Sequence, residues 1–177
     1  MQLRAEQLES HLAKGLRPIY TIHGDEPLLA LEAADAIRAA ARKRGCSERE
    51  VLHVERGFDW SALSHAGASQ SLFGGARIVE LRMPTGKPGT EGGGAIEKYC
   101  EPDRGENVTL VTVPRLDKTT RGSGWFSALG AAGVVTDVWR VARSGLPPWI
   151  AARLARNKQR AGPAVLQFLA DRVEGNL

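Results

Sequence analysis

The chain has 177 residues, of which 42% are hydrophobic and 25% are charged, a composition typical of a folded globular protein and a length that suits one domain with a small appendage. Its 24 basic and 20 acidic residues give a net charge of +4, a mild excess that permits an acidic partner without requiring one. No stretch approaches the ~20 consecutive apolar residues of a membrane-spanning helix, and the first residues lack the pattern of a signal peptide. The two cysteines indicate reduced thiols of a cytoplasmic protein, and the four scattered histidines lack the spacing of a zinc site.

The amino-terminal part of the chain predicts a helix, a strand and a second helix. Residues 1–12 have apolar positions on one helical face, and residues 18–23 form a short apolar run typical of a buried strand. We expect Asp25 to cap the helix that follows over residues 28–44. The apolar positions of that helix recur every three or four residues, at Leu28, Leu31, Ala34, Ile37 and Ala41.

Strands and helices then alternate through the middle of the chain. Apolar and β-branched runs predict four further strands, at residues 51–54, 77–81, 108–113 and 133–139. Helices are predicted between these strands, at residues 60–63, 96–99 and 125–129. Strands that alternate with helices at this spacing indicate an α/β fold with a parallel sheet and helices on both faces.

The pattern changes near the carboxyl end. Residues 145–148, with the sequence Gly-Leu-Pro-Pro, are typical of a hinge. Helices are expected over residues 149–160 and 164–173, and no strand pattern follows them. We therefore expect an α/β domain over residues 1–142 and the beginning of an all-helical unit over residues 143–177.

The turn after the first predicted strand is the place where a nucleotide-binding loop would lie. A phosphate-binding loop needs two glycines, a lysine and a Ser or Thr. Residues 23–29 contain one glycine and no lysine, and the carboxylates of Asp25 and Glu26 would repel a phosphate. We interpret this turn as a helix cap.

Other catalytic and cofactor motifs are also missing from the sequence. Gly86-Lys87 only superficially resembles the end of a phosphate-binding loop, because Pro88 follows it, and we interpret residues 85–94 as a mobile glycine-rich loop. Gly122-Ser123-Gly124 lacks the spacing of a nucleophile elbow. We expect no intrinsic catalysis, no cofactor and no metal.

Two surface features remain as candidates for binding. Ser71-Leu72-Phe73 lies in a loop before a strand, and Leu72 and Phe73 either pack beneath the sheet, at ~1.5–3 kcal/mol each, or form an exposed hydrophobic wedge. Basic residues occur in the loop 115–121 and along the predicted helix 149–160, where they either contact nucleic-acid phosphates or form a solvated face; the helix carries them at Arg153, Arg156 and Arg160.

Taken together, these segments resemble the delta subunit of the bacterial DNA polymerase III clamp loader. The resemblance runs over essentially the whole chain and depends on the order and spacing of short motifs. The motifs are Pro18-Ile19-Tyr20, Gly24-Asp25-Glu26-Pro27-Leu28-Leu29, Phe58-Asp59-Trp60, Ser71-Leu72-Phe73, Arg115-Leu116-Asp117-Lys118-Thr119-Thr120, Trp125-Phe126, Leu146-Pro147-Pro148-Trp149-Ile150 and Glu174-Gly175-Asn176-Leu177.

The resemblance implies an AAA+/RecA-like domain, a small helical domain and a helical collar, with no nucleotide bound by this subunit. It implies a role in DNA replication, in which the subunit binds and opens the ring-shaped sliding clamp (the beta subunit). Ser71, Leu72 and Phe73 then form the clamp-binding element, and the side chains of Leu72 and Phe73 enter the clamp.

The implied partners are the clamp, the gamma/tau and delta prime subunits, and primed DNA only in the assembled complex. Neighbouring subunits hydrolyse ATP, and nucleotidyl transfer belongs to the polymerase complex as a whole. Because the collar is missing, we expect an amino-terminal fragment. The alternatives are a degenerate nucleotide hydrolase and a nucleic-acid-binding module, although a net charge of +4 is not by itself a DNA-binding signature.

Overall fold

The computed structural model describes residues 1–68, 75–101, 106–175 and 177. The chain divides into two compact units, Met1–Val138 and Trp139–Leu177. Among the described residues, none of the helices combines the length and the apolarity that a membrane span requires.

In its described residues, the first unit contains six strands and six helices. The strands are β1 (Gln2–Arg4), β2 (Ile19–Gly24), β3 (Glu48–His53), β4 (Arg77–Arg82), β5 (Val108–Val113) and β6 (Val134–Val138). The helices are α1 (Ala5–Leu12), α2 (Pro27–Lys43), α3 (Ser61–Ala68), α4 (Gly89–Tyr99), α5 (Lys118–Arg121) and α6 (Gly124–Ala132).

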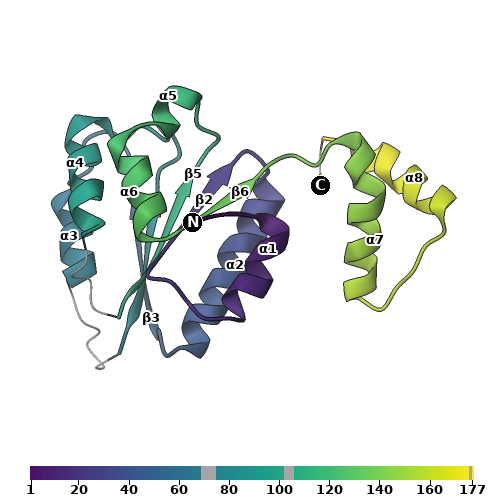
Figure 1. The fold of residues 1–177 in the computed structure, drawn as a ribbon, viewed down its shortest axis with the longest axis horizontal. Helices are drawn as coiled ribbons and strands as arrows, with labels where there is room; N and C mark the ends of the chain where they lie inside the picture. The colour runs from purple at the N-terminus through teal and green to yellow at the C-terminus, as the bar shows by residue number, and fades with distance from the viewer. Residues whose placement is uncertain (69–74, 102–105, 176) are drawn as a thin grey trace. The chain divides into compact units, whose positions relative to one another are not determined.

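All six strands form one sheet in the order β1-β6-β2-β5-β4-β3, and every neighbouring pair is parallel. Helices α1 and α2 cover one face of the sheet, and α3, α4 and α6 cover the other (Figure 1). The predicted α/β fold with helices on both faces is therefore confirmed.

The largest apolar core lies between the sheet and helices α3, α4 and α6. Alternate residues of the central strands point into it, among them Leu81 on β4 and Val111 on β5. Trp60, Trp125 and Phe126 fill the space beneath the helices. This alternation follows from the two-residue period of a strand.

The second unit is helical. It consists of a single 3-10 turn (Arg143–Gly145) and of the helices α7 (Leu146–Arg156) and α8 (Pro163–Val173), which bury Leu146, Ile150 and Ala170 between them. The predicted helix 164–173 is confirmed.

The first prediction that was wrong concerns residues 1–12. Gln2–Arg4 is a strand that pairs in parallel with β6, with Leu3 opposite Thr136, and the helix begins only at Ala5. Three residues are too few to show the period of a strand, and the pairing depends on a partner more than 130 positions away.

The start of α2 also differs from the prediction. The cap position is Glu26, not Asp25, and it makes no capping hydrogen bond through its side chain; Pro27 occupies the first turn, where proline is tolerated. Of the predicted apolar face, Ala34, Ile37 and Ala41 are buried, but in the first two turns Leu29 and Ala33 are buried instead, and Leu31 is 56% exposed.

Residues 89–94 of the predicted glycine-rich loop are helical, and only residues 85–88 lie outside a helix. Helix α4 begins at Gly89 and includes three consecutive glycines. Gly92 lies directly against the ring of Trp60, where a Cβ atom would collide with the indole, and the Trp125 ring lies close to Gly93. Close packing against two tryptophans therefore outweighs the low helix propensity of glycine.

The predicted hinge at residues 145–148 begins a helix instead. Pro147 and Pro148 lie in the first turn of α7, where proline is tolerated because its missing N–H would have no partner in the helix. The helix ends at Arg156, so Arg160 does not continue the predicted basic stripe. The Arg153 guanidinium lies 4.5 Å from the centre of the Trp149 ring.

Candidate functional site

The predicted binding residues Ser71, Leu72 and Phe73 lie in the segment 69–74, outside the described residues. The structure does describe both flanks of this segment. Helix α3 ends at Ala68 and β4 begins at Arg77. Both flanks lie at the amino-terminal edge of the parallel sheet, since β4 starts there.

One buried side chain connects these two flanks. Asn107, which immediately precedes β5, donates from Nδ2 to the carbonyl oxygen of Gly67 at 3.0 Å. Its Oδ1 accepts a hydrogen bond from the backbone N–H of Arg77, also at 3.0 Å. An amide is suited to this position because it has both a donor and an acceptor. Asn107 therefore holds the end of α3 and the start of β4 at a fixed separation.

Further contacts fix both flanks of the segment 69–74, the end of α3 and the start of β4. Gly67 packs so closely against the Tyr99 ring that a Cβ atom would collide with it. The Tyr99 hydroxyl lies 2.7 Å from Oγ1 of Thr109 on β5. The Arg77 guanidinium donates to Glu50 at 2.9 Å and to Glu48 at 3.3 Å, both on β3. The segment 69–74 is thus bounded by anchored residues on both sides.

The turn between β2 and α2 lies at the opposite, carboxyl-terminal edge of the sheet. The Asp25 N–H donates to the carbonyl oxygen of Val138 at 3.2 Å, and a Cβ atom at Gly24 would collide with the same carbonyl. The Asp25 carboxylate lies 3.6 Å from the Arg115 guanidinium. The basic loop and the acidic turn singled out from the sequence are therefore neighbours, and the end of β6 closes the turn.

A buried histidine fixes the surroundings of this turn. His23 Nε2 accepts a hydrogen bond from the Leu116 N–H at 3.1 Å, so the ring proton is on Nδ1, which lies 2.9 Å from the Asp137 carboxylate. The His23 side chain is fully buried. The sequence carries no signal for this pair, because its members are 114 positions apart.

Metal-ligating side chains and cysteines are the remaining groups of chemical interest. Within the described residues, no three His, Cys, Asp or Glu side chains lie close enough to share a metal ion. Cys46 is a buried free thiol. Burial raises the pKa of the Cys46 thiol, which favours its unreactive protonated form.

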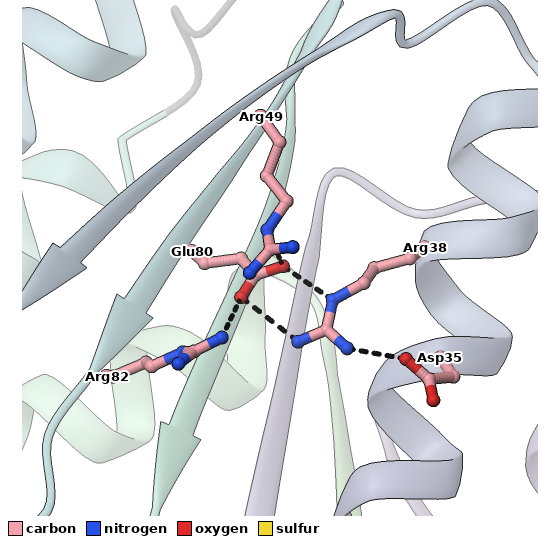
Figure 2. A network of polar contacts seen from close by, with 5 residues as sticks. All are labelled: Asp35, Arg38, Arg49, Glu80 and Arg82. Carbon is pink, nitrogen blue, oxygen red and sulfur yellow. Dashed lines mark hydrogen bonds and ion pairs between the residues drawn. The ribbon is translucent and has the colours of Figure 1, made fainter.

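The most concentrated group of charges was missed by the sequence analysis. The carboxylate of Glu80, in the middle of β4, is only 1% exposed and contacts three guanidiniums (Figure 2). The distances are 2.6 Å to Arg38, 2.8 Å to Arg49 and 3.0 Å to Arg82. Arg38 also contacts Asp35 at 2.7 Å. We name Arg38, Arg49, Glu80 and Arg82 the arginine cluster.

The arginines determine the charge state of Glu80. Burial alone would raise the pKa of this carboxyl, but hydrogen bonds from Arg38 and Arg82 and the charges of Arg38 and Arg49 outweigh it, so the pKa lies below its usual value. The hydrogen bond to Glu80 likewise raises the pKa of Arg38. Glu80 is therefore ionised at neutral pH.

A family model and known proteins are similar to this chain. A family model described as DNA polymerase III, delta subunit, matches residues 20–138. DNA polymerase III subunit delta of Escherichia coli is 28% identical over 177 residues, which are 100% of this chain and 52% of that protein. The subunit delta of Haemophilus influenzae is 37% identical over 79 residues, 45% of this chain and 23% of that protein.

A solved structure shows the same fold. The clamp loader delta protein of Bacillus subtilis superposes with a TM-score of 0.74 at 17% identity, over 98% of this chain and 53% of that one. The chain spans about half the length of the relatives that it matches over its full extent.

Proposed function

Since the chain belongs to the delta-subunit family of DNA polymerase III, we propose that it binds a sliding clamp and opens it during DNA replication, as part of a clamp loader. The observation that supports this most directly is the family match over residues 20–138. That range includes β2 except its first residue, Ile19, strands β3 to β6 and the segment that carries Leu72 and Phe73.

We assign clamp contact to Ser71, Leu72 and Phe73, with the two apolar side chains entering the clamp. Burial of two such side chains in a partner pocket stabilises a complex by ~1.5–3 kcal/mol each. The Asn107 bridge supports the assignment, because a segment with anchored flanks loses less conformational entropy on binding than a free one.

Opening of the clamp then requires differential binding. A closed ring is held by its own interface, and a ligand shifts a conformational equilibrium only by the difference between its affinities for the two states. The subunit thus acts by binding the opened clamp more tightly than the closed one.

The other proposed partners are the gamma/tau and delta prime subunits and, in the assembled complex, primed DNA. Residues 1–142 form the clamp-binding domain in this proposal, and residues 143–177 begin a helical domain. In this proposal a collar domain outside residues 1–177 joins the subunits. The chain covers only 52% of the Escherichia coli protein, which is long enough to contain such a domain.

The clamp contact is tested by measuring the affinity of the chain for the cognate clamp. The double variant Leu72→Ala/Phe73→Ala is expected to weaken binding at least ~100-fold, because at least ~3 kcal/mol of burial is lost and ~1.4 kcal/mol corresponds to tenfold. The matched control is Val165→Ala/Phe168→Ala, which removes two apolar side chains that are exposed on α8.

The control variant should bind like the wild type, and both variants should keep the wild-type melting temperature. Undiminished clamp binding by the Leu72/Phe73 variant would show that these residues are not the contact.

We also propose that this subunit leaves ATP hydrolysis to its neighbours. The β2–α2 turn supports this, because its Asp25 N–H is bonded to Val138 and its acidic side chains would repel a phosphate. A ligand that binds the native state raises the melting temperature. Mg-ATP is expected to leave the melting temperature of this chain unchanged, and a rise that depends on ATP concentration would contradict the proposal.

A further inference from the structure

The edge strand β3 separates its charges by sign onto the two faces of the sheet. Glu48 and Glu50 contact Arg77 on one face. Arg49 contacts Glu80, so it lies on the other face, and the two-residue period places His53 on that face as well. Because α2 makes most of its strand contacts with β2, β5 and β6, the basic side chains of the edge strand β3 lie beside the part of the sheet that it covers.

The arginine cluster concentrates positive charge on this face. Arg42 lies one turn beyond Arg38 on the same side of α2 and is exposed. Arg38, Arg49 and Arg82 contact two carboxylates, those of Asp35 and Glu80, and Arg42 adds a fourth positive charge beside them. The local excess of two positive charges is half of the net charge of the whole chain.

Glu80 positions the arginines without using all of their donors. Each guanidinium has five N–H groups. The Glu80 carboxylate contacts one nitrogen of Arg49 and one of Arg82, and these two side chains are still 39% and 38% exposed. Their remaining donors therefore reach solvent from guanidiniums that a buried carboxylate already orients (Figure 2).

A hollow of about 450 Å³ adjoins the cluster at the carboxyl-terminal edge of the sheet. Arg38, Arg82 and His53 line it, together with apolar atoms of Leu31 and Pro84. None of the described residues that line it is acidic. An anion could enter without meeting a carboxylate on the walls, and the apolar part suits a sugar or the edge of a base.

We propose that the face formed by Arg38, Arg49, His53 and Arg82, the basic sheet face, binds the phosphates of a nucleic-acid strand. Guanidiniums pair with phosphate oxygens through two parallel N–H groups. Nucleic-acid interfaces are more polar and more positively charged than interfaces between proteins, which instead have an apolar core rich in aromatic residues. The basic sheet face has arginines and no aromatic residue other than His53, so a nucleic acid fits it better than an acidic protein.

The basic sheet face does not include the residues of the proposed clamp contact, so it is tested without a clamp. The binding of a labelled oligonucleotide, single-stranded or duplex, is measured between ~50 and ~200 mM salt. The variant Arg49→Gln/Arg82→Gln is expected to reduce the slope of log affinity against log salt by ~1.4 for the single strand and ~1.8 for the duplex, since each lost phosphate contact removes ~0.7 or ~0.9.

The matched control removes two exposed positive charges elsewhere. Lys87→Gln/Lys98→Gln changes the net charge equally next to and on α4, which covers the opposite face of the sheet. The proposal requires the control to keep the wild-type slope. An equal loss in both variants, or no oligonucleotide binding by the wild type, would overturn it.

Three further measurements cover a double variant that does not fold, an acidic protein as the partner and the separation from the clamp contact. Arg49→Gln alone changes an edge-strand residue that is 39% exposed, and it should lower the slope by about half as much if the double variant does not fold. Polyglutamate at the same charge concentration should compete poorly. Displacement of the oligonucleotide by polyglutamate would assign the face to an acidic protein instead. The Leu72→Ala/Phe73→Ala variant should bind the oligonucleotide like the wild type, which separates this proposal from the clamp contact.

Discussion

Glu80 shows how a single residue can control the charge of a surface. A buried carboxylate is stable only when it is paired, and here three guanidiniums from α2, β3 and β4 pair with it. Sequence analysis had no means of finding this group, because Arg38 and Glu80 are 42 positions apart and each looks like an ordinary surface charge. The same holds for Asn107, whose two hydrogen bonds join residues 40 and 30 positions away.

We expect Glu80→Gln to lower the free energy of unfolding by about 3 kcal/mol at neutral pH, since it leaves the three guanidiniums without their carboxylate. Because the pKa of Glu80 is lowered in the folded protein, its stabilising contribution is complete above the unfolded value of about 4.5 and is lost as the pH falls through the lower folded value. Urea unfolding of both proteins across this range measures it. The difference between them should shrink below about pH 4.5, and a constant difference would contradict the assigned charge state.

At the scale of elements, the sequence was most informative where a period extends over a whole element. Strand β5 and helix α8 agree with their predicted ranges, since both have continuous patterns. The patterns were uninformative for β1, which is only three residues long, and misleading for α4, whose glycines fit tertiary neighbours and not helix propensity. The segment 69–74 could be singled out by its apolar pair, but only family resemblance favours its exposure.

The glycines of α4 allow a matched comparison. Gly92→Ala places a methyl group against Trp60, whereas Gly94→Ala meets nothing within 4 Å. Both gain helix propensity of up to ~1 kcal/mol. We expect Gly94→Ala to raise the melting temperature and Gly92→Ala to lower it, as measured by circular dichroism. Stabilisation by both substitutions would show that the contact between Gly92 and Trp60 is not tight.

At the scale of the whole molecule, the net charge and the length do not show how charge and residues are distributed over the fold. The value of +4 hides a basic face and an acidic face on the same edge strand. The length of 177 residues contains two units that each have their own apolar core.

The first unit should require β6 for folding, because β6 lies between β1 and β2 in the sheet. A chain of residues 1–142 is expected to unfold in one cooperative thermal transition, and a chain of residues 1–132 to show none, since β1 then has no strand partner. Differential scanning calorimetry measures both. A cooperative transition in the shorter chain would mean that the sheet forms without β6.

The strand order also sets the sequence of events when the protein is synthesised. Strand β2 pairs only with β5 and β6, and β1 pairs only with β6, so the first two strands have no partner until residues beyond 107 exist. Such non-local pairing slows folding and leaves unpaired strand edges exposed during it. The nascent chain therefore carries unpaired, aggregation-prone strands until β5 and β6 have been synthesised, and its yield in cells should depend on chaperone capacity more than the stability of the finished sheet would suggest.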